Sequence, residues 1–289
     1  MGGTVARPRY AQSARRAVLS AIGRTVAYIL LIVLAVAILY PMLWAILNGF
    51  KTNLEIFGNP WGLPEAWHWE NFVKAWDLGV GRYLLNSVIV TAASVVLTIL
   101  FSAMAAYALT RHRIPFAGPI LVLILGGMML APTVALIPLF NLLRAIGIFN
   151  TYWALIVLYT AFRIPFITFL IRAYMITLSK EMEDAAIVDG ASRWQIFWLV
   201  IMPLSRPIIV SAALLQALFA WNEFVFALAF INDTSLKTLP VGLQQMQGRV
   251  LSDWPVLFAA LTLASIPMIV VFLGGQRQFI RGLSEGFGK

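Results

Sequence analysis

The sequence predicts an all-α, polytopic membrane protein with six transmembrane helices and both termini in the cytoplasm. Apolar residues occupy 61% of the 289 positions and charged residues only 11%, against roughly 45–50% and about 25% in soluble domains. Long apolar runs recur along the chain, and Lys and Arg lie mainly in the tails and in alternate loops between them. A chain this poor in charge has too little polar surface to cover a soluble globule.

Six apolar runs are long enough to cross a bilayer, whose core of about 30 Å needs roughly 20 helical residues. Four runs contain no charged residue, and two contain one each, Arg163 and Glu223. The predicted spans are residues 26–47, 83–109, 117–143, 145–171, 207–231 and 254–276. The first run is too long for the apolar core of a cleavable signal peptide, so we expect it to remain as an anchor.

The distribution of Lys and Arg predicts the orientation. Fourteen of these residues lie in the two tails and in the second and fourth loops, and six lie in the other loops. Because basic residues are enriched on the cytoplasmic side, both tails, 1–25 and 277–289, are expected there. An even number of spans also requires the termini to share a side. The intervening residues, 26–276, form one transmembrane domain.

The predicted outer loop, residues 51–82, is rich in tryptophan. It contains Trp61, Trp67, Trp69 and Trp76, and tryptophan favours the water–lipid interface. We therefore expect this loop to lie on the outer membrane surface. A simple interfacial plug with no specific ligand remains a sufficient explanation for it.

Several function classes are excluded by absent residues and motifs. The chain has no cysteine, which removes disulfides and thiolate–metal sites. The nearest match to a nucleotide-binding loop, residues 282–289, is one residue too long and lacks the final Ser or Thr. We find no serine-hydrolase or zinc-helix motif, and the net charge of +9 is dispersed rather than forming a basic stripe. The sequence therefore predicts no enzyme, cofactor, metal or nucleic-acid partner.

The largest predicted cytoplasmic loop, residues 172–206, has the pattern of two short helices joined at a glycine. Ser179 is placed to cap the first helix, and three acidic residues follow in its first turn, where they complement the helix dipole. Gly190 can end that helix in a left-handed conformation. Ser192 can cap a second helix over 193–202, which Pro203 would break. A helix that merely lies on the membrane is the alternative interpretation.

This loop also resembles a known signature. The stretch Asp184-Ala185-Ala186, three residues, Gly190, nine residues, then Val200-Ile201-Met202-Pro203 resembles the EAA signature of bacterial ATP-binding-cassette (ABC) importer permeases. That signature is Glu-Ala-Ala, three residues, Gly, nine residues, then Ile-x-Leu-Pro. Further stretches are similar to the six-span subunit of maltose-type and glycerol-phosphate-type sugar importers: 84–87, 136–140, 150–152, 221–224 and 278–283.

The resemblance implies a type I importer permease fold in a bacterial cytoplasmic membrane. It implies a heterodimer with a second permease, two ATPase subunits that bind the ATP and magnesium, an extracytoplasmic binding protein, and a carbohydrate or related solute. It assigns ATPase coupling to the loop, with Asp184 meeting the ATPase or capping a helix, Ala185 and Ala186 allowing close contact, and Gly190 supplying the bend. The full predicted coupling set is Glu183, Asp184, Ala185, Ala186, Asp189, Gly190 and Pro203.

Four residues are candidates for the solute path, namely Arg163, Trp221, Asn222 and Glu223. Ionisable groups in a membrane are costly and commonly face a cavity or a partner. An aromatic face beside an amide and a carboxylate suits a sugar. Arg163 pairing locally, and Glu223 belonging to a structural hydrogen-bond cluster, are the alternatives. An ion-coupled secondary transporter is the alternative function, in which Glu223 would carry a proton, although no clear internal repeat is present.

Overall fold

The structure, a computed structural model, describes residues 9–112, 114–129, 131–249 and 253–287, and every regular element in these ranges is helical. The predicted all-α class is confirmed. Within the described ranges, four helices are long and apolar enough to cross a membrane, or up to six if each of two bent helix pairs is one span. Arg7, Arg113 and Lys289, which entered the charge count, lie outside the described residues.

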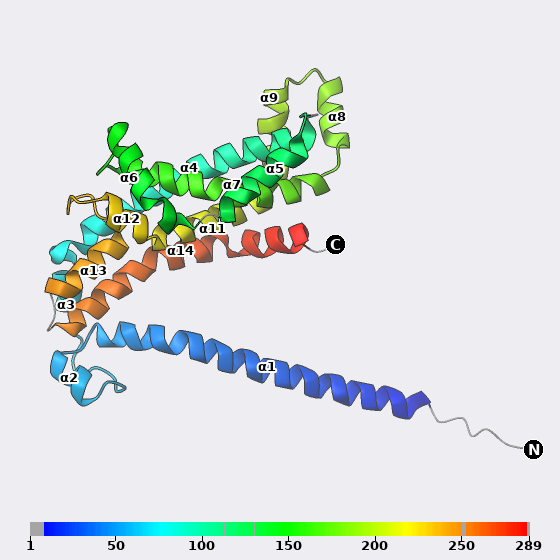
Figure 1. Cartoon of the computed structure of the whole chain (residues 1–289). Coiled ribbons are helices and arrows are strands. Elements are labelled where there is room, and N and C mark those ends of the chain that lie inside the picture. The colour runs from blue at the N-terminus through cyan, green and yellow to red at the C-terminus, as the bar shows by residue number, and fades with distance from the viewer. Residues whose placement is uncertain (1–8, 113, 130, 250–252, 288–289) are drawn as a thin grey trace, which may run out of the picture.

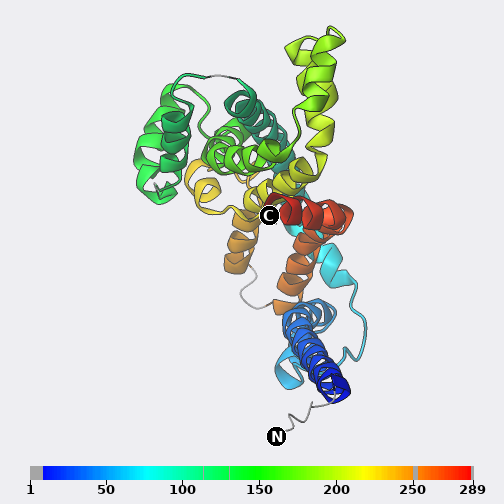
Figure 2. The same ribbon diagram turned by 90° about the vertical axis from the view of Figure 1, so that its right-hand side faces the viewer.

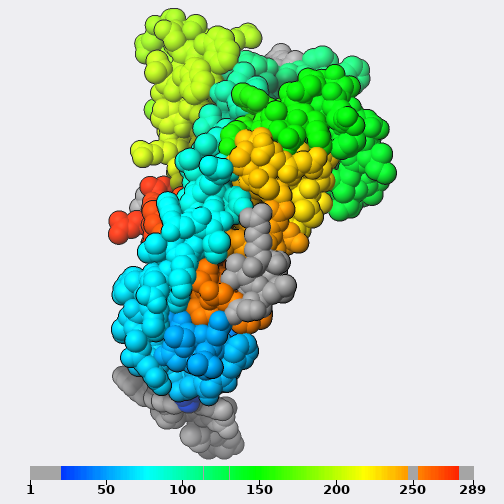
Figure 3. All heavy atoms as spheres, turned by 90° about the vertical axis from the view of Figure 1, so that its left-hand side faces the viewer, coloured from blue at the N-terminus to red at the C-terminus, as the bar shows by residue number. Residues whose placement is uncertain are grey.

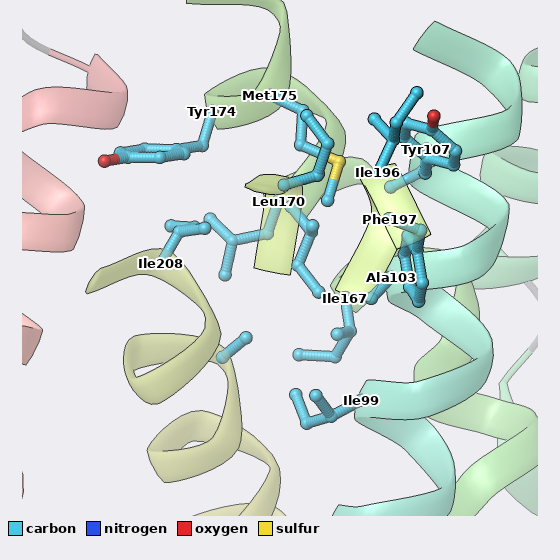
Figure 4. Packing of buried hydrophobic residues seen from close by; sticks show 14 residues of the cluster. Ile99, Ala103, Tyr107, Ile167, Leu170, Tyr174, Met175, Ile196, Phe197 and Ile208 are labelled. Carbon is cyan, nitrogen blue, oxygen red and sulfur yellow. The ribbon is translucent and has the colours of Figure 1, made fainter. Parts of the chain in front are cut away.

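The bundle is built around α4, α7 and α11, with α14 packed along α11 (Figure 1). One apolar cluster joins α4, α7, α9 and α11 at the end that carries α8 (Figure 4), and a second joins α4, α7 and α12 at the opposite end. The elements are α1 (Arg9–Asn48), α2 (Asn53–Gly58), α3 (Glu70–Ala75), η1 (Trp76–Val80), α4 (Gly81–Arg111), α5 (Ala117–Gly126), η2 (Gly127–Met129), η3 (Pro132–Ala135), α6 (Leu136–Ala145), α7 (Tyr152–Thr177), α8 (Glu181–Val188), α9 (Arg193–Ile196), η4 (Phe197–Ile201), α10 (Met202–Leu204), α11 (Arg206–Asn222), α12 (Val225–Phe230), α13 (Leu239–Arg249) and α14 (Trp254–Phe287).

Helix α1 stands apart from the bundle for most of its length (Figure 1). Every residue from 21 to 43 is exposed. Contact begins near its outer end, where the rings of Trp44 and Phe258 of α14 lie 5.2 Å apart. The helix starts at Arg9, so the described part of the predicted tail 1–25 is helical and runs without a break into the first apolar span.

The predicted third span, 117–143, is not one straight helix. The segments Ala117–Met129 and Pro132–Ala145 meet at 85°. Two consecutive glycines, Gly126 and Gly127, lie next to the break, and Pro132 starts the new helical turn, as expected of residues that do not continue a helix.

The fourth and fifth spans also differ from the prediction. Helix α7 begins seven residues after 145 because Gly147 and Asn150 have positive φ values, 75° and 58°, and form a turn. The predicted span 207–231 is interrupted: α11 ends at Asn222, and α12 begins at Val225. The last helix confirms a span over 254–276 but continues to Phe287, so the described part of the tail 277–289 is helical.

The ends of the helices divide the molecule into two sides. The first residues of α1 and the last residues of α14 lie toward the end that carries α8 and α9 (Figures 1 and 2). The opposite end carries α2, α3 and the start of α14 (Figure 3). The start of α1 and the end of α14 therefore lie on the side of the predicted cytoplasmic loop.

The tryptophan-rich segment folds as a small cap at the opposite end. Lys51 is fully buried, and its Nζ donates hydrogen bonds to the carbonyl oxygens of Asn59 (3.0 Å) and Pro60 (3.2 Å). Burial lowers the pKa of Lys51, and the nearby charge of Glu55 opposes that shift. The four tryptophans remain 53–68% exposed. Their location at a membrane interface stays a prediction.

Polar side chains fix the loop that follows α12 onto the start of α4 and the turn before α7. The Asn86 amide donates to the carbonyls of Ser235 and Lys237, both at 2.8 Å. The Asn150 Oδ1 accepts hydrogen bonds from the backbone N–H groups of Asn232 (2.8 Å) and Asp233 (2.9 Å). This loop is therefore held by side-chain contacts to two spans.

Candidate functional site: a coupling elbow and a polar layer between spans

The first candidate site is the elbow formed by α8 and α9. Helix α8 begins at Glu181, with Glu181, Glu183 and Asp184 in its first turn. The N-cap residue is Lys180 rather than the predicted Ser179, although the Ser179 Oγ accepts a hydrogen bond from the Glu181 N–H at 3.2 Å. The acidic first turn is confirmed, and the predicted cap is wrong by one residue.

The corner of the elbow is Gly190, which has φ +80°. The Gly190 N–H donates to the Ile187 carbonyl at 3.0 Å, and the Ala191 N–H donates to the Ala186 carbonyl at 2.9 Å. These two bonds form the helix-terminating motif that requires a left-handed residue at this position. The predicted left-handed end of the helix at Gly190 is confirmed, and its role in coupling stays a prediction.

Ser192 caps the second arm as predicted. Its Oγ accepts a hydrogen bond from the Gln195 N–H at 3.3 Å, while the Gln195 side chain accepts one from the Ser192 N–H at 2.8 Å, which completes a capping box. The predicted break at Pro203 is displaced, because Pro203 lies inside α10 and the 78° bend falls at Ser205. Proline is compatible with the first turn of a helix, so α10 accommodates it.

The two arms differ in how they meet the bundle. Ile196, Phe197 and Ile201 of the second arm are buried in the cluster with Tyr107 of α4 and Ile171 of α7 (Figure 4). In α8, by contrast, Glu183 is the one buried residue, and Ala186 is half-buried. Asp184, Ala185 and the C-cap residue Asp189 are exposed.

Glu183, one of the predicted coupling residues, faces the bundle rather than solvent. It forms an ion pair with Arg111 at the end of α4, between Oε1 and Nε, and the two side chains are only 10% and 7% exposed. Arg111 Nη2 also donates a hydrogen bond to the Leu178 carbonyl at 3.0 Å, at the C-cap of α7. Burial raises the pKa of Glu183, and the adjacent Arg111 charge partly offsets this.

The second candidate site is a polar layer between α7 and α11, where the fifth predicted span breaks. The Glu223 carboxylate accepts a hydrogen bond from the Tyr159 hydroxyl at 2.7 Å. It also accepts from the backbone N–H groups of Phe226 (2.8 Å) and Ala227 (3.2 Å), so it caps α12. The Gln216 amide, which the sequence did not single out, lies 3.5 Å from the Tyr159 carbonyl. These contacts support the structural alternative for Glu223.

Arg163 lies one helical turn after Tyr159 and is half-buried. Its guanidinium carbon is 4.9 Å from the centre of the Phe166 ring and 4.7 Å from that of the Phe219 ring. Cation–π contacts of this kind stabilise a desolvated guanidinium. Arg163 therefore has aromatic partners within its own chain.

Trp221 and Asn222 face a different space. They line a cavity of about 420 Å³ between α11, α13 and α14, together with Leu239, Pro240, Leu243, Leu261, Ala264, Ser265, Met268 and Ile269. The Asn222 amide donates a hydrogen bond to the Leu218 carbonyl at 2.8 Å. The structure thus separates the four predicted path residues into two on this cavity and two in the layer beside α7. Ser265, which lines the cavity, was missed because an isolated serine in an apolar span gives no sequence signal.

No group of three or more His, Asp or Glu side chains that could hold a metal ion occurs among the residues that the structure describes.

Comparison with known proteins places this arrangement in a family. Residues 98–285 match the family described as "Binding-protein-dependent transport system inner membrane component". The chain is 46% identical over 265 residues to "Probable ABC transporter permease protein YurM" of Bacillus subtilis, covering 92% of this chain and 88% of that protein. It is 34% identical over 264 residues to "Diacetylchitobiose uptake system permease protein NgcG" of Streptomyces coelicolor, covering 90% and 87%.

A solved structure has the same fold. The chain superposes with a TM-score of 0.78 and 24% identity on a chain from the "Crystal structure of a bacterial ABC transporter involved in the import of the acidic polysaccharide alginate", covering 96% of this chain and 100% of that one. The family match and the curated relatives, together with the long apolar helices, establish a multi-pass protein of the bacterial cytoplasmic membrane. The chain belongs to the family of binding-protein-dependent transport system inner membrane components, the permease subunits of ABC importers.

Proposed function

We propose that this permease subunit pairs with a second, different permease to form the path for a carbohydrate, and that two ATPase subunits drive it through the α8–α9 elbow. The observation that carries the proposal is the elbow itself: a helix held at a left-handed glycine, with one arm anchored in the bundle and the other exposed. An exposed arm on a rigid base is what a subunit outside the membrane needs in order to move the spans.

The exposed face of α8 suits a protein partner. Met182, Ile187 and Val188 are 57%, 59% and 86% exposed, and they lie on the same short helix as Asp184 and Ala185. Apolar residues rimmed by charge mark interaction sites, and the small Ala185 side chain permits close approach. We assign the contact with an ATPase subunit to this face, with the elbow and both chain termini on the cytoplasmic side.

The exposure of helix α1 supports the proposal of a second permease subunit. Its exposed apolar side chains continue for more than 20 residues without covering any part of their own bundle. Lipid alone would satisfy such a helix, but a helix that stands apart from its own bundle (Figure 1) also offers its apolar length to another subunit. We propose that the partner permease packs against α1.

The carbohydrate assignment rests on relatives and on the cavity beside α11. The relative from Streptomyces coelicolor is named for diacetylchitobiose uptake. In this chain, the cavity of about 420 Å³ offers an indole, an amide and a hydroxyl from Trp221, Asn222 and Ser265. We propose that these three side chains contact the solute as it passes.

Co-purification tests the assignment of the ATPase contact. The importer is expressed with a tag on this chain, and the ATPase recovered per permease is compared for wild type, Asp184→Lys and Ala185→Leu. Both variants are expected to lose most of the ATPase, because they change the exposed face of α8. Glu65→Lys is the matched control, an exposed acidic residue at the opposite end of the molecule. Undiminished ATPase recovery with both α8 variants would overturn the assignment.

A further inference from the structure

The attachment of α8 to the rest of the molecule is unusually narrow. Of its eight residues, Glu183 is the one that is buried, and Ala186 is the half-buried neighbour on the same side. The second arm, by contrast, inserts Ile196, Phe197 and Ile201 into the cluster shown in Figure 4. Besides its chain connections to α7 and to the corner at Gly190, α8 therefore meets the bundle through the side chains of Glu183 and Ala186.

The partner of that carboxylate belongs to a different part of the chain. Arg111 occupies the last turn of α4, 72 positions earlier, and its guanidinium contacts both Glu183 and the Leu178 carbonyl. One buried guanidinium thus joins the ends of two spans, α4 and α7, to the first turn of α8. The planar guanidinium presents several donors in fixed directions, which suits it to hold three elements together.

The surroundings of the pair keep water away from it. The Tyr107 ring lies one turn before Arg111, is buried, and packs against Phe197 with ring centres 5.3 Å apart. Removing one member of a buried ion pair leaves an uncompensated buried charge, which is strongly destabilising. The pair therefore resists separation more than an exposed pair would, because water and salt screen an exposed pair.

We propose that the Arg111–Glu183 ion pair is the mechanical link that transmits the movement of α8 to α4, so that both are positioning residues for coupling and not part of the surface that binds the ATPase. The inference rests on the proposed function of the elbow. It assigns different roles to two acidic residues of the first turn, with Asp184 facing the partner and Glu183 facing the bundle. Helix α4 can pass a displacement on to the other spans, since it packs along both α7 and α11.

The experiment separates binding of the ATPase from coupling. The complete importer with its binding protein is reconstituted in proteoliposomes, and three quantities are measured for each variant: ATPase recovered per permease, basal ATP hydrolysis, and the stimulation of hydrolysis by the solute-loaded binding protein. Glu183→Gln and Arg111→Gln are compared with Glu181→Gln, an exposed glutamate in the same turn.

We expect Glu183→Gln and Arg111→Gln to retain the ATPase and basal hydrolysis but to lose at least tenfold of the stimulation. Glu181→Gln should behave as wild type. The charge-exchanged double variant, Arg111→Glu with Glu183→Arg, should recover part of the stimulation lost in each single exchange. A merely structural role would lower the yield of assembled complex and would leave stimulation per assembled complex unchanged.

Two results would overturn the inference. Full stimulation in both single variants would show that the pair transmits nothing. Loss of the ATPase itself in Glu183→Gln would place Glu183 in the binding surface after all. If instead Asp184→Lys and Ala185→Leu keep the ATPase, the proposed function of the elbow is wrong. That result is distinguishable from failure of the ion-pair proposal, because it concerns ATPase binding and not stimulation. Glu183→Asp, which keeps the charge, serves as the second variant if a glutamine variant does not assemble.

Discussion

The hydroxyl of Tyr159 donates a 2.7 Å hydrogen bond to the carboxylate of Glu223, joining α7 to the point at which the fifth span breaks. The same carboxylate caps α12 through the N–H groups of Phe226 and Ala227. Glu223 therefore replaces, with its own oxygens, the backbone acceptors that an uninterrupted helix would have supplied. A charged residue within a membrane span is tolerated here because its hydrogen bonds are made inside the protein.

Loss of the Glu223 carboxylate should weaken the fold at this break. Glu223→Ala leaves two N–H groups of α12 without an acceptor, and each unsatisfied buried group costs about 1–3 kcal/mol. Tyr159→Phe should cost less, because interhelical hydrogen bonds in membranes average about 0.6 kcal/mol and reach about 1.7. The melting temperature of the purified complex measures which of the two variants is destabilised more. Glu223→Gln, which keeps an acceptor oxygen, is the control.

An unchanged melting temperature for Glu223→Ala, together with lost transport, would contradict this assignment. It would restore the interpretation in which Glu223 acts on the solute.

Substitution at Gly190 should damage coupling more than insertion. A Cβ at this position meets nothing within 4 Å, so the expected penalty comes from the left-handed backbone, φ +80°, and not from a clash. That conformation costs a non-glycine residue about 1–2 kcal/mol, enough to move the arm. Gly190→Leu should insert normally and lose solute-stimulated ATP hydrolysis and uptake. Gly190→Asn should retain most of both, because asparagine tolerates this conformation.

Normal uptake by Gly190→Leu at a normal expression level would argue against a fixed elbow.

Acidification of the side that carries α8 should weaken coupling. The loss should begin at a higher pH than it would for a glutamate with an ordinary pKa. Burial raises the pKa of Glu183 above its usual 4.5, while Arg111 opposes the shift. A raised carboxyl pKa means that the neutral form appears at a higher pH as the pH falls. Protonated Glu183 then no longer carries the negative charge that pairs with Arg111. The measurement is stimulated ATP hydrolysis in proteoliposomes as a function of pH, with each protein normalised to its own maximum. As the pH falls, the wild-type activity should decline at a higher pH than the activity of Glu183→Gln, which has no carboxyl group to titrate at this position.

Identical pH profiles for wild type and Glu183→Gln would show that titration of Glu183 does not affect coupling.

The loop that follows α12 should loosen when its side-chain contacts are removed. Asn86→Ala deletes the donors to the Ser235 and Lys237 carbonyls, and Asn150→Ala deletes the acceptor for two backbone N–H groups. Hydrogen exchange over residues 231–239 should become faster in both variants, by an amount that corresponds to about 0.5–1.5 kcal/mol per hydrogen bond. Unaltered exchange would indicate that the loop is held by other contacts. Asn232→Ala, whose exposed side chain leaves its backbone N–H in place, is the control.

The sequence predicts local features of this molecule better than long-range ones. The left-handed turn at Gly190 and the cap at Ser192 depend on neighbours within four residues, and the structure confirms both. The break at Glu223 depends on Tyr159, which lies 64 positions away. Apolar composition alone cannot distinguish a broken span from a continuous one, and the 207–231 prediction failed for that reason.

The same distinction applies to the coupling loop. The spacing of Asp184, Ala185 and Gly190 indicated the elbow correctly, but not that the adjacent Glu183 turns inward to Arg111. Asn86 and Asn150 lie in stretches that resemble the family. Their contacts with the loop that follows α12 nevertheless depend on how the folded chain packs. Pattern identifies which residues matter, and the three-dimensional contacts decide what each one does.

The most direct test of the account is ATP-dependent solute accumulation in proteoliposomes with defined subunits. The sugar bound by the cognate binding protein is the labelled solute, and vesicles contain either this chain alone or this chain with the second permease, the ATPase subunits and the binding protein. We predict accumulation only in the complete system with ATP, and none from this chain alone under a proton or sodium gradient. Gradient-driven accumulation by the chain alone, at the rate of the complete system, would contradict the account.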